Sequence, residues 1–262
     1  MSVAAVLSTH QMPTVSATVP SALSVEGVTV GYEAAHPILK DLNLSIPQGS
    51  CWAIVGPSGS GKTTLLRTLL GLLPPVQGKV SRAGVDAAST GRARIGYIPQ
   101  NLGLVRNVSV RQNVLLGALT RLPWWQAVLG RFPADERKAA EEALALVGLS
   151  GRGDERIETM SGGERRRVAI ARALLQRPHL LLADEFLAEL DKNTAQEIEA
   201  LLQMLREKTG VTILFVDHDI EAACRIADRV VVLVEGRKVC ELDACNADPQ
   251  DILGMFRENC AA

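Results

Sequence analysis

The pattern of hydrophobic and polar positions changes as the chain proceeds. Apolar and polar residues alternate from Leu23 to Val30 and from Leu42 to Ile46, which predicts antiparallel strands with one exposed face. From Cys51 to Val55 the residues are continuously apolar, and this run leads into GPSGSGKTT and then LLRTLLGLL. Because a continuously apolar strand is buried on both faces, this stretch predicts a strand, a glycine-rich loop and a helix within an α/β core.

Helical periodicity dominates the middle of the chain. Between Gln100 and about Gln176, apolar positions recur every three or four residues over Val110 to Leu119, Ala134 to Val147 and Glu164 to Leu175. We therefore expect an inserted helical subdomain. Strands and helices then alternate again, with HLLLAD, VTILFV and RVVVLV separated by helical segments at 194–208 and 220–227. Such alternation predicts a parallel sheet.

Composition narrows the class of protein. The formal charge is −1, with acidic and basic residues interspersed, which disfavours a nucleic-acid partner. The longest apolar runs, such as Val211 to Val216, have the length of strands and fall short of the roughly 20 residues that a membrane helix needs. The five cysteines show no CxxC spacing, which argues against a disulfide framework or a zinc site and favours a reduced, cytoplasmic setting.

The glycine-rich segment carries the first chemical signal. Residues 56–63 read GPSGSGKT, which matches the G-x-x-x-x-G-K-[ST] loop and lies between a predicted strand and a predicted helix. In such a loop backbone N–H groups surround phosphate oxygens, Lys62 reaches the β and γ phosphates, and the Thr63 hydroxyl binds Mg²⁺. The alternative is a glycine-rich turn with an exposed lysine. The candidate phosphate-binding residues are Gly56, Pro57, Ser58, Gly59, Ser60, Gly61, Lys62, Thr63 and Thr64.

Two carboxylates follow a later apolar strand. Asp184 ends the run Leu180 to Ala183, where it is placed to hold the metal of a phosphate-binding loop. Glu185 follows directly, where a carboxylate can polarise the water that attacks the γ phosphate. The alternative for Glu185 is a helix cap or a surface acid. Together these motifs predict ATP and Mg²⁺ as ligands.

The predicted fold is an α/β P-loop NTPase core. Its RecA-like mixed sheet is preceded by an antiparallel β-subdomain at the N-terminal end and interrupted by the helical subdomain at about 101–176. The nucleotide-binding domain is expected over 23–247. Residues 1–22 lack the basic start and the unbroken apolar stretch of a signal peptide, and they are expected to form a flexible tail. A second tail is expected at 248–262.

The sequence between the two motifs resembles one P-loop family in particular. MSGGERRRVAIARALL, at 160–175, is similar to the LSGGQ signature and the helix that follows it in ATP-binding-cassette (ABC) ATPases. Gln100 in YIPQN resembles the Q-loop, Asp191 in AELD the D-loop and His218 in FVDHD the switch histidine, while Tyr32 matches the aromatic residue that stacks on adenine. The resemblance covers Leu23 to about Leu242.

This resemblance implies a site shared by two copies of the chain. Ser161, Gly162, Gly163 and Glu164 would bind the γ phosphate of ATP held by the other copy, with Asp191 beside them. Gln100 would contact the metal or the attacking water, and His218 would orient the water that Glu185 polarises. The implied catalytic residues are therefore Glu185, His218 and Gln100, and the implied metal ligands are Thr63, Gln100 and Asp184.

Three positions depart from the family pattern. Met160 and Glu164 replace the usual Leu and Gln of the signature, and Ala188 replaces a D-loop hydroxyl. A carboxylate near a helix N-terminus is locally favourable, but Glu164 also moves negative charge towards a triphosphate site. We therefore expect Glu164 to slow hydrolysis and the loss of the hydroxyl at Ala188 to weaken coupling between the two sites.

The segment from Asn113 to Arg137 resembles the helical subdomain of phosphonate importer ATPases. This implies a peripheral ATPase at the cytoplasmic face of the inner membrane, partnered by membrane permease subunits and, indirectly, by a periplasmic or lipoprotein solute-binding protein. The expected cargo is a phosphonate, phosphite or phosphate-like oxyanion. Trp124 and Trp125 would face the permease or, alternatively, pack a short helix. An exporter or lipid-extraction ATPase and a soluble regulatory ABC ATPase remain as alternatives.

Overall fold

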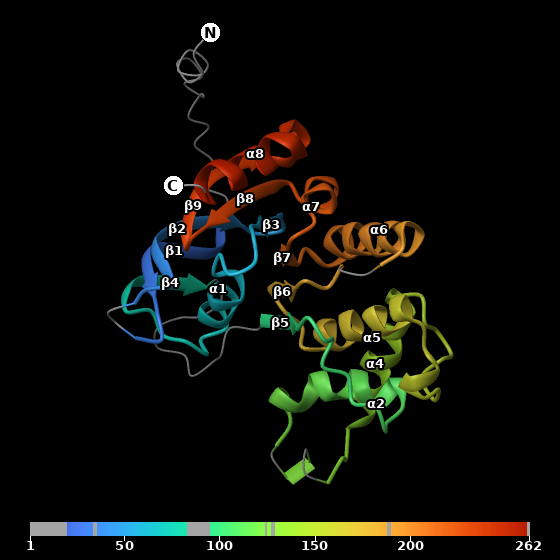
Figure 1. Ribbon diagram of the computed structural model, residues 1–262. Helices are drawn as coiled ribbons and strands as arrows, with labels where there is room; N and C mark the ends of the chain where they lie inside the picture. Colours follow the sequence, from blue (N-terminus) through green and yellow to red (C-terminus); the bar gives the residue numbers. More distant parts are fainter. Residues whose placement is uncertain are drawn as a thin grey trace.

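The computed structural model (Figure 1) describes residues 20–33, 36–82, 95–123, 125–126, 129–187 and 190–260. These residues form two sheets and a lobe of helices (Figure 1), and their buried apolar side chains make up two clusters. The expected α/β P-loop NTPase fold, with its antiparallel N-terminal sheet and inserted helices, is confirmed.

The N-terminal sheet has the strand order β2-β1-β4. Strands β1 (Ser21–Val30) and β2 (Leu39–Pro47) pair antiparallel, with Leu23 opposite Ile46 and Val28 opposite Leu42. These four side chains are fully buried, as the alternating pattern predicts. Strand β4 (Gln77–Arg82) pairs with the other edge of β1 and was not expected, because its sequence QGKVSR is mostly polar and its side chains are exposed or half-buried.

The central sheet has the strand order β5-β6-β7-β3-β8-β9. Its strands are β5 (Ile95–Ile98), β6 (Leu180–Asp184), β7 (Thr212–Asp217), β3 (Cys51–Val55), β8 (Arg229–Val234) and β9 (Arg237–Asp243). The first five run parallel, and β9 returns antiparallel along β8. The predicted parallel sheet therefore ends in one antiparallel edge strand.

Both faces of the central strands are buried. In β6, Leu180 and Leu182 pack into the core shared with the N-terminal sheet and helix α1 (Lys62–Leu69). Leu181 and Ala183 pack into the core that extends to the helical lobe. Because successive side chains of a strand point to opposite faces, this double burial explains why the strand sequence is apolar throughout.

The helical lobe lies at one end of the molecule, beside β5 and β6 (Figure 1). It contains α2 (Val110–Leu115), the 3₁₀ segment Leu116–Arg121, α4 (Ala134–Leu146) and α5 (Gly162–Leu175). The helix expected over Val110 to Leu119 thus changes to a 3₁₀ helix after Leu115. The change falls next to Gly117, and glycine is a poor residue for the interior of an α-helix.

Helices α6 (Lys192–Thr209) and α7 (Ile220–Ile226) connect the later strands of the central sheet. Helix α6 starts two residues before the predicted Thr194 because the Asp191 side chain caps its first turn, accepting a hydrogen bond from the Thr194 N–H at 3.0 Å. Among the described residues, no helix combines the length and the apolar character that crossing a membrane requires.

Both expected tails require correction. Ser21 and Ala22 already belong to β1, and the Ser21 hydroxyl can donate a hydrogen bond to the Ile46 carbonyl of β2 at 3.2 Å. Pro20 is also described, whereas residues 1–19 of the expected N-terminal tail lie outside the described residues. At the other end, residues 249–260 form helix α8 (Pro249–Cys260), whose Ile252 is fully buried.

This packing predicts unequal effects at two neighbouring positions of α8. Ile252→Ala should lower the free energy of unfolding by about 2–5 kcal/mol, because it removes a fully buried side chain and leaves a cavity. Leu253→Ala, at a side chain that is 36% exposed, should change it by about 0.5 kcal/mol or less. Urea denaturation of both variants measures this difference, and equal small effects would show that α8 adds no stability.

Candidate nucleotide-binding site

The glycine-rich loop connects β3 to α1 with its backbone in conformations that glycine allows. Gly61, the residue before α1, has φ +101°, in the left-handed region. A Cβ on Gly56 would lie 2.1 Å from the Leu233 carbonyl oxygen of β8, so only glycine fits there. No side chain caps the start of α1, which leaves backbone N–H groups of its first turn available for an anion.

Lys62 folds back over this loop. Its Nζ donates hydrogen bonds to the carbonyls of Gly56 at 2.8 Å and Pro57 at 3.0 Å, and the residue is 7% exposed. Burial lowers the pKa of Lys62, while the carboxylates of Glu185, Asp184 and Asp217 oppose that shift. The structure therefore rules out the glycine-rich turn with an exposed lysine.

Asp184 and Glu185 lie at the end of β6, near Lys62. Burial raises the pKa of Asp184, and the neighbouring Glu185 carboxylate raises it further, while Lys62 and Arg67 act in the opposite direction. Glu185 has φ +43° and donates its N–H to the Val216 carbonyl of β7 at 2.9 Å. Its carboxylate accepts a hydrogen bond from Gln100 Nε2 at 2.8 Å, so the two residues predicted for catalysis after β5 and after β6 are brought together.

His218 follows β7 and lies next to a buried carboxylate. The Asp217 carboxylate accepts hydrogen bonds from the backbone N–H groups of His218 at 2.8 Å and Asp219 at 3.1 Å. Its other oxygen is buried and has no hydrogen-bond partner in the part of the chain that the structure describes, and burial raises the pKa of Asp217. The imidazole of His218 is 62% exposed, with Nδ1 3.5 Å from the Asp217 carboxylate. Asp217 thus fixes the backbone that presents His218.

Tyr32 extends from the turn after β1, and its ring is exposed. Arg67 of α1 donates a hydrogen bond to its hydroxyl at 2.6 Å, which holds the aromatic ring beside the helix that follows the glycine-rich loop. An exposed ring held in this way can stack on a planar base. Sequence patterns gave no indication of Arg67, because it lies on a helix whose other signals concern packing.

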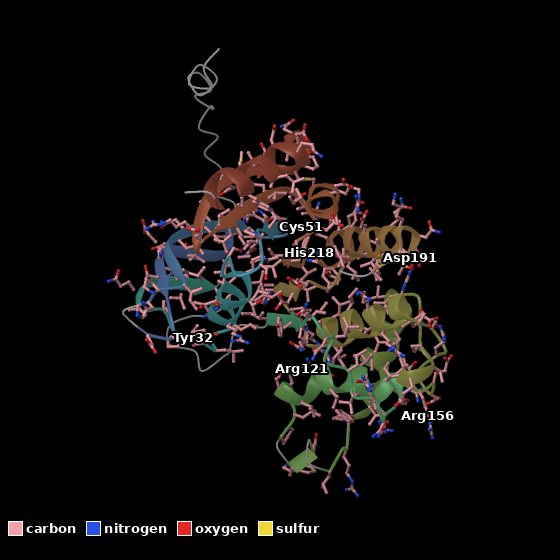
Figure 2. The ribbon with its side chains drawn as sticks, in the orientation of Figure 1. Tyr32, Cys51, Arg121, Arg156, Asp191 and His218 are labelled. Atoms are coloured by element: carbon pink, nitrogen blue, oxygen red, sulfur yellow. The ribbon has the colours of Figure 1, made fainter. Side chains whose placement is uncertain are left out.

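The signature residues Ser161 to Glu164 form the start of α5. The Ser161 hydroxyl accepts a hydrogen bond from the Glu164 N–H at 3.2 Å, and the Glu164 carboxylate accepts one from the Ser161 N–H at 2.8 Å. This reciprocal arrangement is a capping box. In Figure 2 the neighbouring Arg156 and the predicted adenine contact Tyr32 lie on opposite sides of the molecule. One copy of the chain therefore does not bring these two predicted regions together.

The predicted D-loop residue Asp191 serves as the cap of α6. Its carboxylate accepts hydrogen bonds from the N–H of Thr194 at 3.0 Å and from its hydroxyl at 2.7 Å, and these bonds lower the pKa of Asp191. Ala188, the departure expected to weaken coupling, lies outside the described residues. Sequence reasoning also missed Asp217, although it ends an apolar strand in the same way as Asp184.

The residues present fit a magnesium nucleotide. A loop with available backbone N–H groups and a buried lysine suits phosphate, and the buried Ser60 hydroxyl has no hydrogen-bond partner among the described residues. Thr63, Gln100 and Asp184 offer oxygen ligands, which Mg²⁺ prefers. A cation there would also offset the crowding of the Asp184 and Glu185 carboxylates that raises the pKa of Asp184.

The chain is similar to known proteins over most of its length. The profile of the ABC transporter family matches residues 39–188, more than half of the chain. The chain is 39% identical to the phosphonates import ATP-binding protein PhnC of Nitratidesulfovibrio vulgaris, over 82% of this chain and 83% of the relative. It is 41% identical to PhnC 1 of Natronomonas pharaonis, over 89% of this chain and 99% of that relative.

Solved structures show the same architecture. The chain resembles cbiO1 of Clostridium perfringens, part of the ABC transporter complex cbiONQ, with a TM-score of 0.76 and 30% identity over 90% of this chain and 92% of that one. It also resembles the ATP-binding cassette MJ0796, solved as a dimer bound to ADP and phosphate, with a TM-score of 0.71 and 31% identity over 86% and 100% of the two chains. With the phosphate-binding loop, the carboxylates and the signature helix in place, the chain belongs to the ABC transporter family, as one of its ATP-hydrolysing subunits.

Proposed function

We propose that two copies of this chain drive the import of a phosphonate, a phosphite or a related oxyanion through a separate membrane permease. The observation that carries the dimer is the separation, within one chain, of Tyr32 from Arg156, which lies five residues before Ser161 of the signature (Figure 2). A second copy would supply the missing signature to each site, and the similar cassette MJ0796 has been solved as a dimer. The cargo class rests on the relatives that are named for phosphonate import.

In this proposal each residue near the loop has a defined task. Lys62 and the N–H groups at the start of α1 bind and orient the phosphates of ATP, and Thr63, Gln100 and Asp184 would hold Mg²⁺, which supplies charge neutralisation. Glu185 accepts the proton of the attacking water, while His218 orients that water. Gly162 and Gly163 of the second copy donate backbone N–H groups to the γ phosphate and help to exclude bulk water.

A groove on the helical lobe supports docking of the permease. It has a volume of about 390 Å³ and lies between the 3₁₀ segment after α2 and the residues before α4. Its lining is mainly apolar and consists of Val105, Val108, Gln112, Leu115, Leu116, Leu119, Gly130, Phe132 and Arg137. Such a groove suits an amphipathic helix, which would place the subunit peripherally at the cytoplasmic face of the membrane. A periplasmic or lipoprotein solute-binding protein would then act on the permease, not on this chain.

Trp125 follows the 3₁₀ segment Leu116–Arg121 in the chain. Trp125 is 46% exposed, which fits an interface residue better than a packing residue, whereas Trp124 lies outside the described residues. Among the described residues the neighbouring Leu129 is also exposed, at 61%. The exposed apolar surface therefore extends beyond the groove itself.

Glu185→Gln should cut ATP hydrolysis by about 10²–10⁴ and leave ATP binding intact, because an amide cannot accept the proton of the water. The amide still reaches Gln100, so the local hydrogen bonding is preserved. Steady-state phosphate release and equilibrium nucleotide binding measure the two effects. The exposed Glu207→Gln is the control and should retain normal turnover. Normal turnover in Glu185→Gln would show that this carboxylate is not the base.

Val105→Asp should preserve the basal ATPase rate of the isolated subunit and lower the stimulation by reconstituted permease. Val105 is 44% exposed and lines the groove, so a carboxylate there would be desolvated by a docked helix. Val239→Asp is a matched control on β9, at a valine that is 38% exposed and distant from the groove in sequence. Equal stimulation of both variants would remove the groove from the permease interface.

Deleting the gene should abolish growth on a phosphonate or phosphite as sole phosphorus source. The wild-type allele should restore growth and the Glu185→Gln allele should fail, because transport requires hydrolysis. Uptake of a radiolabelled phosphonate measures the same loss directly. Normal growth on both sources together with lost export of a lipid or drug would favour the exporter alternative.

A further inference from the structure

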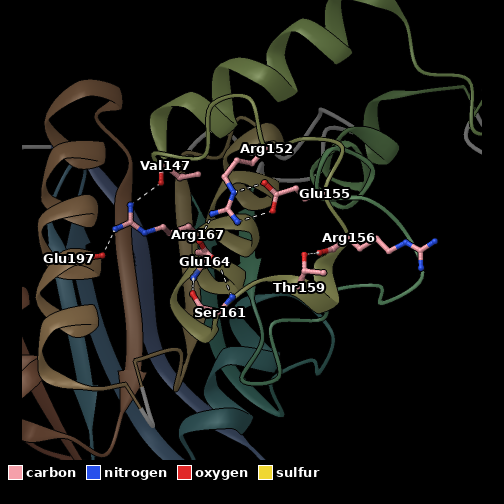
Figure 3. A network of polar contacts seen from close by, with 9 residues as sticks. All are labelled: Val147, Arg152, Glu155, Arg156, Thr159, Ser161, Glu164, Arg167 and Glu197. Atoms are coloured by element: carbon pink, nitrogen blue, oxygen red, sulfur yellow. Dashed lines mark hydrogen bonds and ion pairs between the residues drawn. The ribbon is translucent and has the colours of Figure 1, made fainter.

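Glu164 occupies the signature position where the family usually has Gln, and its carboxylate is fully engaged. One oxygen accepts the N–H of Ser161 at 2.8 Å, and the other accepts a hydrogen bond from Arg152 (Figure 3). These bonds, led by that from Arg152, lower the pKa of Glu164. The departure expected to repel the triphosphate is therefore paired with a cation from the same chain.

Arg152 belongs to the turn between α4 and α5 and is oriented by a second carboxylate. Its Nε and one of its terminal nitrogens donate to the two oxygens of Glu155 at 2.7 and 2.8 Å, which fixes the plane of the guanidinium. The remaining nitrogen points at Glu164 (Figure 3). The charge of Glu164 acts to raise the pKa of Glu155, so the two carboxylates are close enough to repel each other. Without Arg152 they would face each other beside the signature with no arginine between them.

The same bonds decide which groups the signature can offer. The capping box uses the N–H groups of Ser161 and Glu164. The N–H groups of Gly162 and Gly163, the first two helical residues, have no acceptor within the helix. The Ser161 hydroxyl accepts the Glu164 N–H, so its own proton remains available for a ligand.

We infer that Arg152 is a positioning residue for ATP hydrolysis, which neutralises Glu164 and holds the start of α5 so that Ser161, Gly162 and Gly163 face the γ phosphate bound by the second copy. This inference rests on the proposed dimer. It also revises the expectation that Glu164 repels the nucleotide: the carboxylate does so only when Arg152 is removed.

The test measures the ATP-dependent dimer in a Glu185→Gln background, which slows hydrolysis, by sedimentation velocity with MgATP. Arg152→Met should raise the dimer Kd by about tenfold at low salt, because an unpaired carboxylate then faces the triphosphate. Combining it with Glu164→Gln should bring the Kd back to within about twofold of Glu164→Gln alone. Arg152→Lys should fall between, since lysine keeps the charge and loses the fork.

Arg111→Met is the matched control. Arg111 is 34% exposed, against 33% for Arg152, and also pairs with two carboxylates, Glu141 and Asp154, outside the signature. It should leave the dimer Kd unchanged, and both arginine variants should bind ATP normally as monomers. Added salt should narrow the gap between Arg152→Met and the parent, because it screens the repulsion.

Two results would overturn the inference. If Arg152→Met and Arg111→Met weaken the dimer and lower the thermal unfolding temperature equally, with no rescue by Glu164→Gln, Arg152 has only a structural role. If Arg152→Met leaves the dimer Kd at the parent value, Arg152 does not position the signature. A Glu185→Gln parent that stays monomeric with MgATP would instead remove the proposed dimer itself, and the inference with it.

Discussion

The structure depends on one constraint, which is that parallel strands buried on both faces can place polar groups only at their ends. In the order β5, β6, β7 and β3, the residues that follow the strands are Gln100, Glu185, His218 and Gly56. Because neighbouring parallel strands end at the same edge of a sheet, these residues converge without any further organisation. The apolar sequences that bury the strands therefore also gather the charged groups of the site.

Bringing these groups together buries charges, and this burial is energetically unfavourable until a ligand compensates for it. Burial raises the pKa of Asp184 and Asp217 and lowers that of Lys62, so each ionised group is less stable than it would be in water. Lys62 meets part of this cost by donating to the loop carbonyls of Gly56 and Pro57. Phosphate oxygens and a cation would offset the rest, so these groups suit a magnesium nucleotide.

The sequence predicted those parts of the site in which short motifs act through local backbone geometry. The loop at Gly56 to Thr63 and the carboxylates at the end of β6 needed only their strand and helix context. Strands β4 and β9 were missed because edge strands are half-exposed and carry mixed residues, so they lack the alternating or continuous apolar pattern. Helix α8 was not predicted, although Ile252 is fully buried among the described side chains of that helix.

Contacts between side chains on opposite sides of a turn could not be predicted from the sequence. Arg152 and Glu164 are separated by a turn and a 3₁₀ segment, Ile157–Thr159, and nothing in their spacing shows that they meet. The structure changes the meaning of Glu164 for this reason: a residue judged alone is a misplaced charge, whereas the same residue with its arginine is a neutralised helix cap. The effect of a residue that departs from a family pattern can therefore be assigned only when the residues around it in the structure are known.

The helical lobe is joined to the carboxylate edge through contacts that run in both directions from Gln100. On one side Gln100 donates to Glu185 at 2.8 Å. On the other, Arg172 of α5 donates to the carbonyls of Leu102 and Gly103, both at 2.6 Å, so the segment after Gln100 is fastened to the signature helix. Val105, on the same segment, lines the apolar groove. A displacement of the lobe at its groove would therefore move α5 and the Gln100 segment together, and it would act on the hydrogen bond from Gln100 to Glu185.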